Sequence, residues 1–179
     1  IVVSLNAGIA IRKTIDSVLC QTFGDYEIIV KDGMSIDKTI DYIPRDPRIR
    51  VFVTRDLGIY DAMDEALAQA SGRYICFLNC GDVFANYSVL KSIYDASLAR
   101  PGPVIFYCDF IDKDIFKTSV NRLNGFTLYK NPLNHQSMFY SRDVFSLCGT
   151  FDTGFKVMAD YEFTLRAFFA GIKYVYCNI

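Results

Sequence analysis

Asparagine and aspartate residues recur directly after the apolar runs of this 179-residue chain, where they could bind a ligand. Carboxylate and amide oxygens bind hard cations and hydrogen-bond hydroxyl or amide groups. Polar residues also follow strands simply because loops face water, so the pattern alone leaves both interpretations open. The residues concerned are Asn6, Asp32, Asp56, Asn79, Asp82, Asp109 and Asp112.

The segment NCGD (79–82) is the sharpest of these signals, because it follows the most apolar run of the chain. Gly81 permits a tight turn or a close approach of the backbone. The carboxylate of Asp82 could hold Mg²⁺ or Mn²⁺, with phosphate oxygens and water filling the other positions. A plain turn is the alternative, since these residue types also favour turns.

Composition and missing motifs exclude several classes of protein. Nineteen basic against twenty acidic residues argue against a protein that coats nucleic acid, and a single histidine, His135, excludes a multi-histidine zinc site. No GxxxxGK[ST], GxGxxG or GxSxG motif occurs. A P-loop NTPase, a dinucleotide-dependent oxidoreductase and an α/β-hydrolase are therefore disfavoured.

The elements that must position these residues alternate between strands and helices. Strands are predicted at 1–5, 26–30, 48–54, 73–78 and 104–110, and helices at 9–22, 35–42, 59–71 and 86–99. This order predicts an α/β fold with a mostly parallel central sheet and helices on both faces. In such sheets ligands bind beyond the carboxyl ends of the strands, where the asparagines and aspartates lie.

The second half of the chain has a different pattern. Strands are predicted at 113–119, 137–140 and 173–177 and one helix at 158–170, which indicates a mixed C-terminal part. We expect one domain over 1–179, because no repeat or linker interrupts it. The chain opens on a strand at Ile1 and stops after YVYCNI, so we expect a fragment of a longer protein.

Six cysteines without a CxxC pair predict reduced thiols and a cytoplasmic protein. No apolar run approaches the ~20 residues that a membrane-spanning helix needs.

Four segments, in order, resemble the family 2 glycosyltransferases of the GT-A fold, and in particular their colanic-acid and exopolysaccharide type. Residues 1–39 resemble the opening of that family, with a strand ending in Asn and a "DGSSTDGT"-type turn. Residues 56–82, which begin DLGIYDAM and end FLNCGD, resemble the "GIYDAMNKG…FLNSGD" approach to the metal motif. NHQSMFYSRDVF (134–145) resembles the acceptor-side segment, and residues 151–171 resemble the final "DYELxLR" helix.

The resemblance implies a nucleotide-binding half over about 1–110. Asp32 would hydrogen-bond the nucleobase, Asn6 would line the same pocket, and Asp56 would lie near the base or ribose. Asn79 and Asp82 would occupy the "DxD" position, with Asp82 as the ligand of Mg²⁺ or Mn²⁺. Carboxylates of the common motif are replaced here by Asn79 and Gly81, which should lower the affinity for metal.

The resemblance also implies an acceptor and catalytic half over about 111–179. Asp160 would be the general base, and His135 and Arg166 would lie near the acceptor or the diphosphate. From the sequence alone, Asp160 could equally cap its helix, and Glu162 is a rival carboxylate. His135 could be a structural residue, and Arg166 a surface cation near the end of its helix.

The implied activity is inverting transfer of a sugar from a UDP-, GDP- or dTDP-sugar to a hydroxyl acceptor in surface polysaccharide synthesis. The acceptor would be a glycan or a lipid-linked sugar, and the enzyme would be peripheral at the inner membrane face. Two alternatives remain, a sugar nucleotidyltransferase and a non-catalytic nucleotide-binding module of the same fold.

Overall fold

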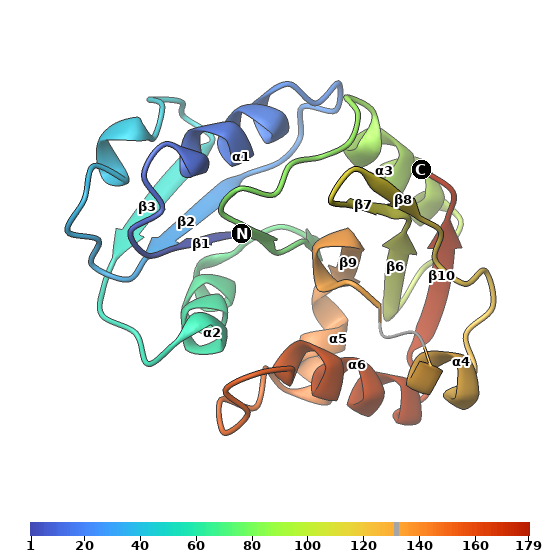
Figure 1. Cartoon of the computed structure of the whole chain (residues 1–179). Coiled ribbons are helices and arrows are strands. Elements are labelled where there is room, and N and C mark those ends of the chain that lie inside the picture. The colour runs from blue at the N-terminus through green and yellow to red at the C-terminus, as the bar shows by residue number, and fades with distance from the viewer. Residues whose placement is uncertain (131–132) are drawn as a thin grey trace. The chain divides into compact units, whose positions relative to one another are not determined.

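The computed structural model describes residues 1–130 and 133–179, and its chain divides into two compact units (Figure 1). The first unit comprises residues 1–72 and 77–90, and the second comprises 73–76 and 91–179. This division follows the contacts within the chain and differs from the predicted halves. The expectation of a single domain over 1–179 remains a prediction.

A four-stranded parallel sheet forms the centre of the first unit. Its strands, in spatial order, are β3 (Ile49–Val53), β2 (Ile28–Asp32), β1 (Val2–Ser4) and β5 (Leu78–Asn79). Helices α1 (Ala10–Leu19) and α2 (Ile59–Gln69) lie on opposite faces of these strands (Figure 1). A short 3-10 helix, η1, spans Ile40–Tyr42. The predicted α/β fold with a parallel sheet is confirmed.

The apolar periodicity of the two helices accounts for their packing. Ile11, Ile15 and Val18 of α1 are buried at helical spacing. On α2 the buried residues include Met63 and Leu67, whereas Ile59 at its start is exposed. Strands β1 and β2 are covered on both faces and are buried throughout, whereas β3 is an edge strand and is largely exposed.

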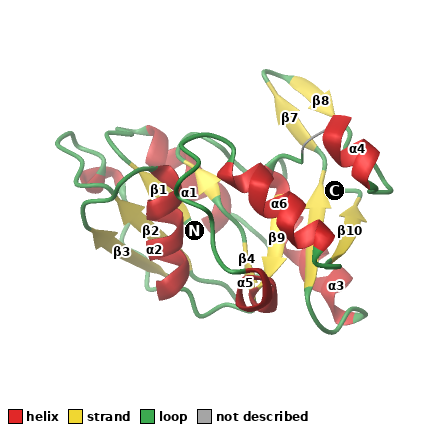
Figure 2. Ribbon diagram, turned by 90° about the horizontal axis from the view of Figure 1, so that it is seen from below, coloured by secondary structure: helices red, strands yellow, loops and turns green. Residues whose placement is uncertain are grey.

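The second unit is built on a mixed four-stranded sheet with the order β10–β6–β9–β4 (Figure 2). Its strands are β10 (Lys173–Cys177), β6 (Val104–Cys108), β9 (Met138–Ser141) and β4 (Tyr74–Ile75). Strands β7 (Phe110–Asp112) and β8 (Ile115–Lys117) form a separate hairpin. The helices are α3 (Val89–Leu98), which begins at the end of the first unit, α4 (Gly125–Lys130), η2 (His135–Ser137), α5 (Arg142–Cys148) and α6 (Ala159–Phe169).

The core of the second unit contains an aromatic cluster. Phe163 of α6 is fully buried and stacks on Phe145 of α5, with ring centroids 5.1 Å apart. Phe151 and Tyr140 contact the same ring. Phe169, also predicted as an apolar face residue of this helix, is 78% exposed. The buried positions of α6 are instead Ala159, Phe163, Thr164 and Ala167.

The prediction of one strand over 73–78 was wrong, and two short helices were not predicted. The apolar run 73–78 is not one strand, because β4 pairs with β9 while β5 pairs with β1. Helices α4 and α5 have only six and seven residues, too short for their periodicity to stand out in the sequence. Helix α2 ends with Ala70 as its C-cap, and the N–H of Gly72 donates to the carboxylate of Glu27.

Within the described ranges, every helix is too short or too polar to cross a bilayer.

Candidate active site

The carboxyl edge of the first unit's sheet brings together all five residues predicted to bind nucleotide or metal. In the parallel register Asp32 lies beside Ser4 of β1 and Val53 of β3, and Asn79 lies beside Val3. Asn6, Asp56 and Asp82 follow these strand ends within a few residues. The chain proceeds from β1 to β2 and β3 on one side and places β5 on the other. The loops after β1 and β5 therefore flank a topological switch point, where open α/β sheets bind ligands.

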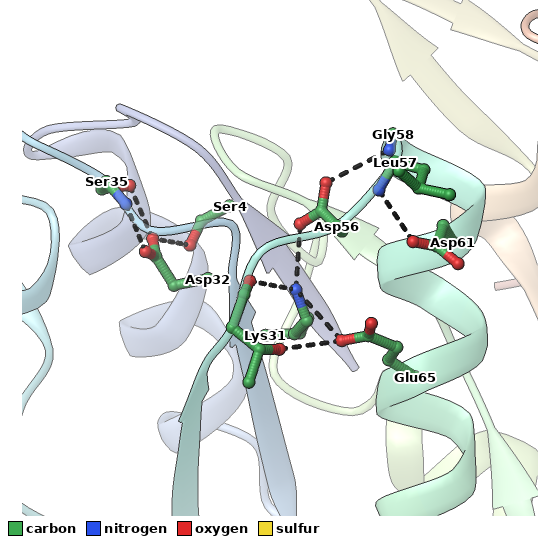
Figure 3. Close-up of polar contacts among 10 residues, drawn as sticks. Ser4, Lys31, Asp32, Ser35, Asp56, Leu57, Gly58, Asp61 and Glu65 are labelled. Atoms are coloured by element: carbon green, nitrogen blue, oxygen red, sulfur yellow. Dashed lines mark hydrogen bonds and ion pairs between the residues drawn. The ribbon is translucent and has the colours of Figure 1, made fainter.

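Asp32 organises the turn that follows β2. The structure places it inside the strand, fully buried, rather than after the strand end as predicted. Its Oδ2 accepts hydrogen bonds from the hydroxyls of Ser4 and Ser35, at 2.8 and 2.6 Å (Figure 3). Its Oδ1 accepts the backbone N–H of Ser35 at 2.7 Å. Three hydrogen bonds satisfy this buried carboxylate and fix the turn.

Asn6 joins the loop after β1 to that same turn. Its Oδ1 accepts the backbone N–H of Ile36 at 2.9 Å, and its own N–H donates to the Ser35 hydroxyl at 2.7 Å. Its φ is 51°, a left-handed conformation that asparagine tolerates better than most residues. The N–H of Gly8 donates to Asp37 and Thr39. The two loops are thus held together by side-chain acceptors.

Asp56, in the loop after β3, forms an ion pair with a buried lysine. Its Oδ2 is 2.9 Å from Nζ of Lys31, and its Oδ1 accepts the N–H of Gly58 at 3.2 Å (Figure 3). Lys31 is 1% exposed. An ion pair this well buried fixes the orientation of the Asp56 carboxylate.

The loop that carries Asn79 and Asp82 is fixed by α1 and by its own turn. The N–H of Gly81 donates to the hydroxyl of Thr14, a buried residue of α1, at 2.8 Å. The N–H of Asp82 donates to the carbonyl of Asn79 at 3.0 Å. Gly81 has a φ of 104°, and nothing would contact an added Cβ there, so conformation rather than space favours glycine.

Cys80 of this loop is an inert thiol rather than a nucleophile. Its thiol lies 3.3 Å from the carbonyl of Val3. Burial and the negative charges of Asp32 and Asp82 raise its pKa to about 12. The thiol therefore stays protonated near neutral pH.

The donor set at this edge fits a divalent cation that is shared with a ligand. Asp82 is exposed on a loop whose backbone is held in place, and the carboxylate is a hard oxygen donor. The described part of the chain contains no group of three His, Cys, Asp or Glu side chains arranged around a metal. Such a site suits Mg²⁺ or Mn²⁺, which keep waters and take phosphate oxygens as further ligands.

The second unit brings two of the predicted catalytic residues into contact. Asp160 lies in the first turn of α6, and its Oδ2 is 2.7 Å from Nδ1 of His135 in η2. The helix begins after Met158 without a side-chain cap, so the alternative in which Asp160 merely caps its helix is wrong. The two side chains are 18% and 14% exposed and remain accessible to a ligand.

Arg166 is on the same helix but contacts neither residue of this pair. Its guanidinium forms an ion pair with Glu162, at 2.6 Å, and donates to the backbone carbonyls of Cys148 and Thr150. The hydrogen bond to Glu162 is the largest cause of the raised pKa of Arg166, and it outweighs the opposing effect of burial. The structure gives Arg166 a structural role between α6 and the end of α5, and its place near an acceptor remains a prediction.

Sequence reasoning missed the residues that support the candidate side chains. They are Ser4, Thr14, Lys31, Ser35, Asp37, Thr39 and Glu65. Lys31, directly after an apolar run, was one signal in the sequence, because a buried lysine is unusual and needs a partner. Nothing in the sequence indicated which acidic residues would be that partner.

Comparison with known proteins gives a family match over most of the chain. Residues 1–159 match the family described as glycosyl transferase family 2. The PGL/p-HBAD biosynthesis glycosyltransferase of Mycobacterium tuberculosis is 31% identical over 183 residues, which cover 94% of this chain and 68% of that protein. The UDP-Glc:alpha-D-GlcNAc-diphosphoundecaprenol beta-1,3-glucosyltransferase WfaP of Escherichia coli is 28% identical over 180 residues, which cover 97% and 70%.

Solved structures share the fold. Staphylococcus aureus TarS 1-349 in complex with UDP-GlcNAc superposes with a TM-score of 0.77 at 18% identity, over 99% of this chain and 57% of that one. The mannosyltransferase PcManGT from Pyrobaculum calidifontis, in complex with GDP-Man and Mn²⁺, gives 0.74 at 18% identity, over 99% and 55%. The chain therefore spans just over half the length of these structures. The fold is the one that the sequence predicted, GT-A.

Proposed function

Because the chain belongs to glycosyl transferase family 2, we propose that it is an inverting enzyme that transfers a sugar from a nucleoside diphosphate sugar to a hydroxyl acceptor. The observation that carries the proposal is the 2.7 Å contact between Asp160 and His135. It gives a candidate base a fixed orientation on a helix, which keeps its position better than a loop would.

The nucleotide would bind at the carboxyl edge of the parallel sheet. Asn6 and Asp32 would line the pocket for the nucleoside, and Asp56 would lie near the base or ribose. Asp32 is buried and hydrogen-bonded, so its first effect is to hold the turn at Ser35 in place. The solved complexes of TarS with UDP-GlcNAc and of PcManGT with GDP-Man support a nucleotide-sugar donor.

Asp82 would hold the divalent cation. When bound, Mg²⁺ or Mn²⁺ neutralises the negative charge that develops on the departing nucleoside diphosphate. The Mn²⁺ complex of PcManGT supports this assignment. Asn79, at the start of the same loop, would also face the phosphates.

Asp160 would take the proton of the acceptor hydroxyl. The acceptor oxygen forms a bond to the anomeric carbon while the bond from that carbon to the diphosphate oxygen breaks on the opposite face, which inverts the configuration. The electron pair of the broken bond leaves with the nucleoside diphosphate, and the proton moves to the Asp160 carboxylate. An imidazole N–H at His135 Nδ1 would hold that carboxylate in place.

The names of two relatives support a proposal for the acceptor class and the location. WfaP is named for a diphosphoundecaprenol-linked acceptor, and the mycobacterial relative for PGL/p-HBAD biosynthesis, which support a lipid-linked or glycan acceptor in bacterial surface-glycan synthesis. An enzyme with such an acceptor would work in the cytoplasm, peripherally at the inner face of the membrane.

Binding and turnover of nucleotide-sugars test this proposal. Calorimetry with UDP, GDP and dTDP should detect one preferred nucleotide, with Mn²⁺-dependent affinity that Asp82→Asn loses. Asp160→Asn should keep that affinity but lower sugar-nucleotide turnover by about 10²- to 10⁴-fold. Retained turnover would remove the base assignment, and the absence of any nucleotide binding would overturn the proposed function.

Asp82 belongs to the first compact unit and Asp160 to the second. Nucleotide binding without turnover in the wild type, under all metal and acceptor conditions, would favour the non-catalytic module.

A further inference from the structure

Lys31 is a deeply buried cation at the carboxyl edge of the first unit's sheet. Its side chain is 1% exposed and ends among three oxygen atoms. Nζ lies 2.8 Å from the carbonyl of Thr54, 2.9 Å from Oδ2 of Asp56 and 3.4 Å from Oε2 of Glu65 (Figure 3). The first two contacts are hydrogen bonds and the third is an ion pair, and together they compensate the buried ammonium group.

The partners of Lys31 come from two further elements of the same unit. Thr54 and Asp56 follow β3, and Glu65 is on α2, where it also accepts the hydroxyl of Thr54 at 2.8 Å. Lys31 therefore joins β2, the loop after β3 and one helix at a single point. Successive residues of a strand point to opposite faces, so Lys31 fixes this loop while Asp32 fixes the turn at Ser35.

The contact with Asp56 also constrains the turn after β2. A Cβ added at Gly33 would lie 2.7 Å from Oδ2 of Asp56, the oxygen that Lys31 binds. Gly33 therefore packs directly against that carboxylate. The other oxygen of Asp56 accepts the N–H of Gly58 and orders the start of α2. The carboxylate has one orientation that satisfies all three neighbours.

We propose that Lys31 is a positioning residue for nucleotide binding, which acts by holding Asp56 and the loop at 54–58 in the arrangement that receives the nucleoside part of the donor. This inference rests on the proposed function. Lys31 is too buried to contact the nucleotide itself. Its charge orders the carboxylate, and without it Asp56 and Glu65 would repel one another and turn towards solvent.

The test measures nucleotide affinity and thermal stability of the full chain with UDP, GDP and dTDP in the presence of Mn²⁺. Lys31→Met, which keeps a side chain of similar length, should weaken binding of the preferred nucleotide at least about tenfold. Asp56→Asn should also weaken binding. The double variant should bind nucleotide no more weakly than the weaker-binding single variant, because both changes disrupt the same arrangement of side chains. Lys91→Met, which breaks an exposed ion pair on α3, is the control and should leave affinity unchanged.

Gly33→Ala provides a second route to the same result, and keeps the proposal testable if Lys31→Met fails to fold. It leaves the lysine in place and pushes a methyl group against Asp56. Gly24→Ala is its matched control, since nothing lies within 4 Å of a Cβ there. Gly33→Ala should weaken nucleotide binding at least about fivefold, and Gly24→Ala should not.

The outcomes separate the inference from the proposed function. The inference would be overturned if Lys31→Met folds, is less stable, and still binds nucleotide within twofold of wild type, because the role of Lys31 would then be purely structural. If Lys31→Met does not fold, the same result for Gly33→Ala would overturn it. Nucleotide binding by the wild type and its loss in Asp82→Asn would leave the proposed function intact in that case. Absence of binding in the wild type would overturn both.

Discussion

Nδ1 of His135 lies 2.7 Å from Oδ2 of Asp160, which joins a 3-10 helix and the first turn of α6 through the single histidine of the chain. The turn that carries His135 is itself fixed, because the side chain of Asn134 accepts the N–H of Gln136 at 2.9 Å. Both partners are thus placed by backbone elements, and the carboxylate is oriented before any acceptor binds.

Replacing His135 should therefore impair turnover more than binding. His135→Ala removes the group that orients Asp160, and misplacement of a base costs rate without changing the nucleotide site. We expect kcat to fall by about 10- to 100-fold and the affinity for the donor nucleotide to stay within twofold. Steady-state turnover and calorimetry on the same preparation would check this, and an unchanged kcat would show that Asp160 needs no orienting partner.

Arg166 should contribute to stability rather than to nucleotide binding. Its guanidinium donates to the carbonyls of Cys148 and Thr150, which no other residue type could reach in the same geometry. Arg166→Ala should lower the free energy of unfolding by about 1–3 kcal/mol. Urea denaturation and nucleotide calorimetry would separate the two roles, and a loss of affinity without a loss of stability would restore the predicted contact with the diphosphate.

Glu27 should make the protein sensitive to acid. Burial alone raises the pKa of this carboxyl, but hydrogen bonds outweigh it and lower the pKa to about 2 from an ordinary 4.5. The donors are the N–H and hydroxyl of Ser71, the guanidinium of Arg50 and the N–H of Gly72. A carboxyl with a lowered folded pKa stabilises the protein above its unfolded pKa, and this stabilisation is lost as the pH falls from about 4.5 towards 2.

Glu27→Ala should accordingly cost on the order of 1–3 kcal/mol at pH 7 and progressively less below pH 4.5. Urea denaturation of both proteins between pH 7 and pH 3 would give the two curves. Asp95→Ala, which breaks an exposed pair with Lys91, is the control and should change stability by less than about 0.5 kcal/mol. Parallel curves for Glu27→Ala and wild type would contradict the assignment.

Phe163 should be the most sensitive position of α6. Its ring is fully buried among Phe145, Phe151 and Tyr140, so Phe163→Ala would leave a cavity and cost about 3–5 kcal/mol. Phe169→Ala on the same helix changes a side chain that is 78% exposed and should cost less than about 1 kcal/mol. Thermal or urea denaturation would distinguish the two, and equal effects would mean that the aromatic cluster does not support the second unit.

The sequence by itself determined the alternation of strands and helices, and with it the parallel sheet. Buried strands such as 28–32 and amphipathic helices such as 10–19 are set by local spacing of apolar residues, which a sequence shows directly. The polar residues that follow those strands could be located for the same reason, since parallel strands end at one edge. The NCGD motif at 79–82 and the acidic residue Asp160 could also be identified from the sequence.

Only the tertiary structure decided how those residues are held. The pairing of Lys31 with Asp56, 25 positions away, and of His135 with Asp160 depends on which elements pack together, and no local pattern contains that information. The division of the run 73–78 between two sheets has the same origin, because each half pairs with a different distant strand. Local spacing predicts an element and its buried face, whereas partners across the fold are fixed by burial and hydrogen bonding that only the assembled chain provides.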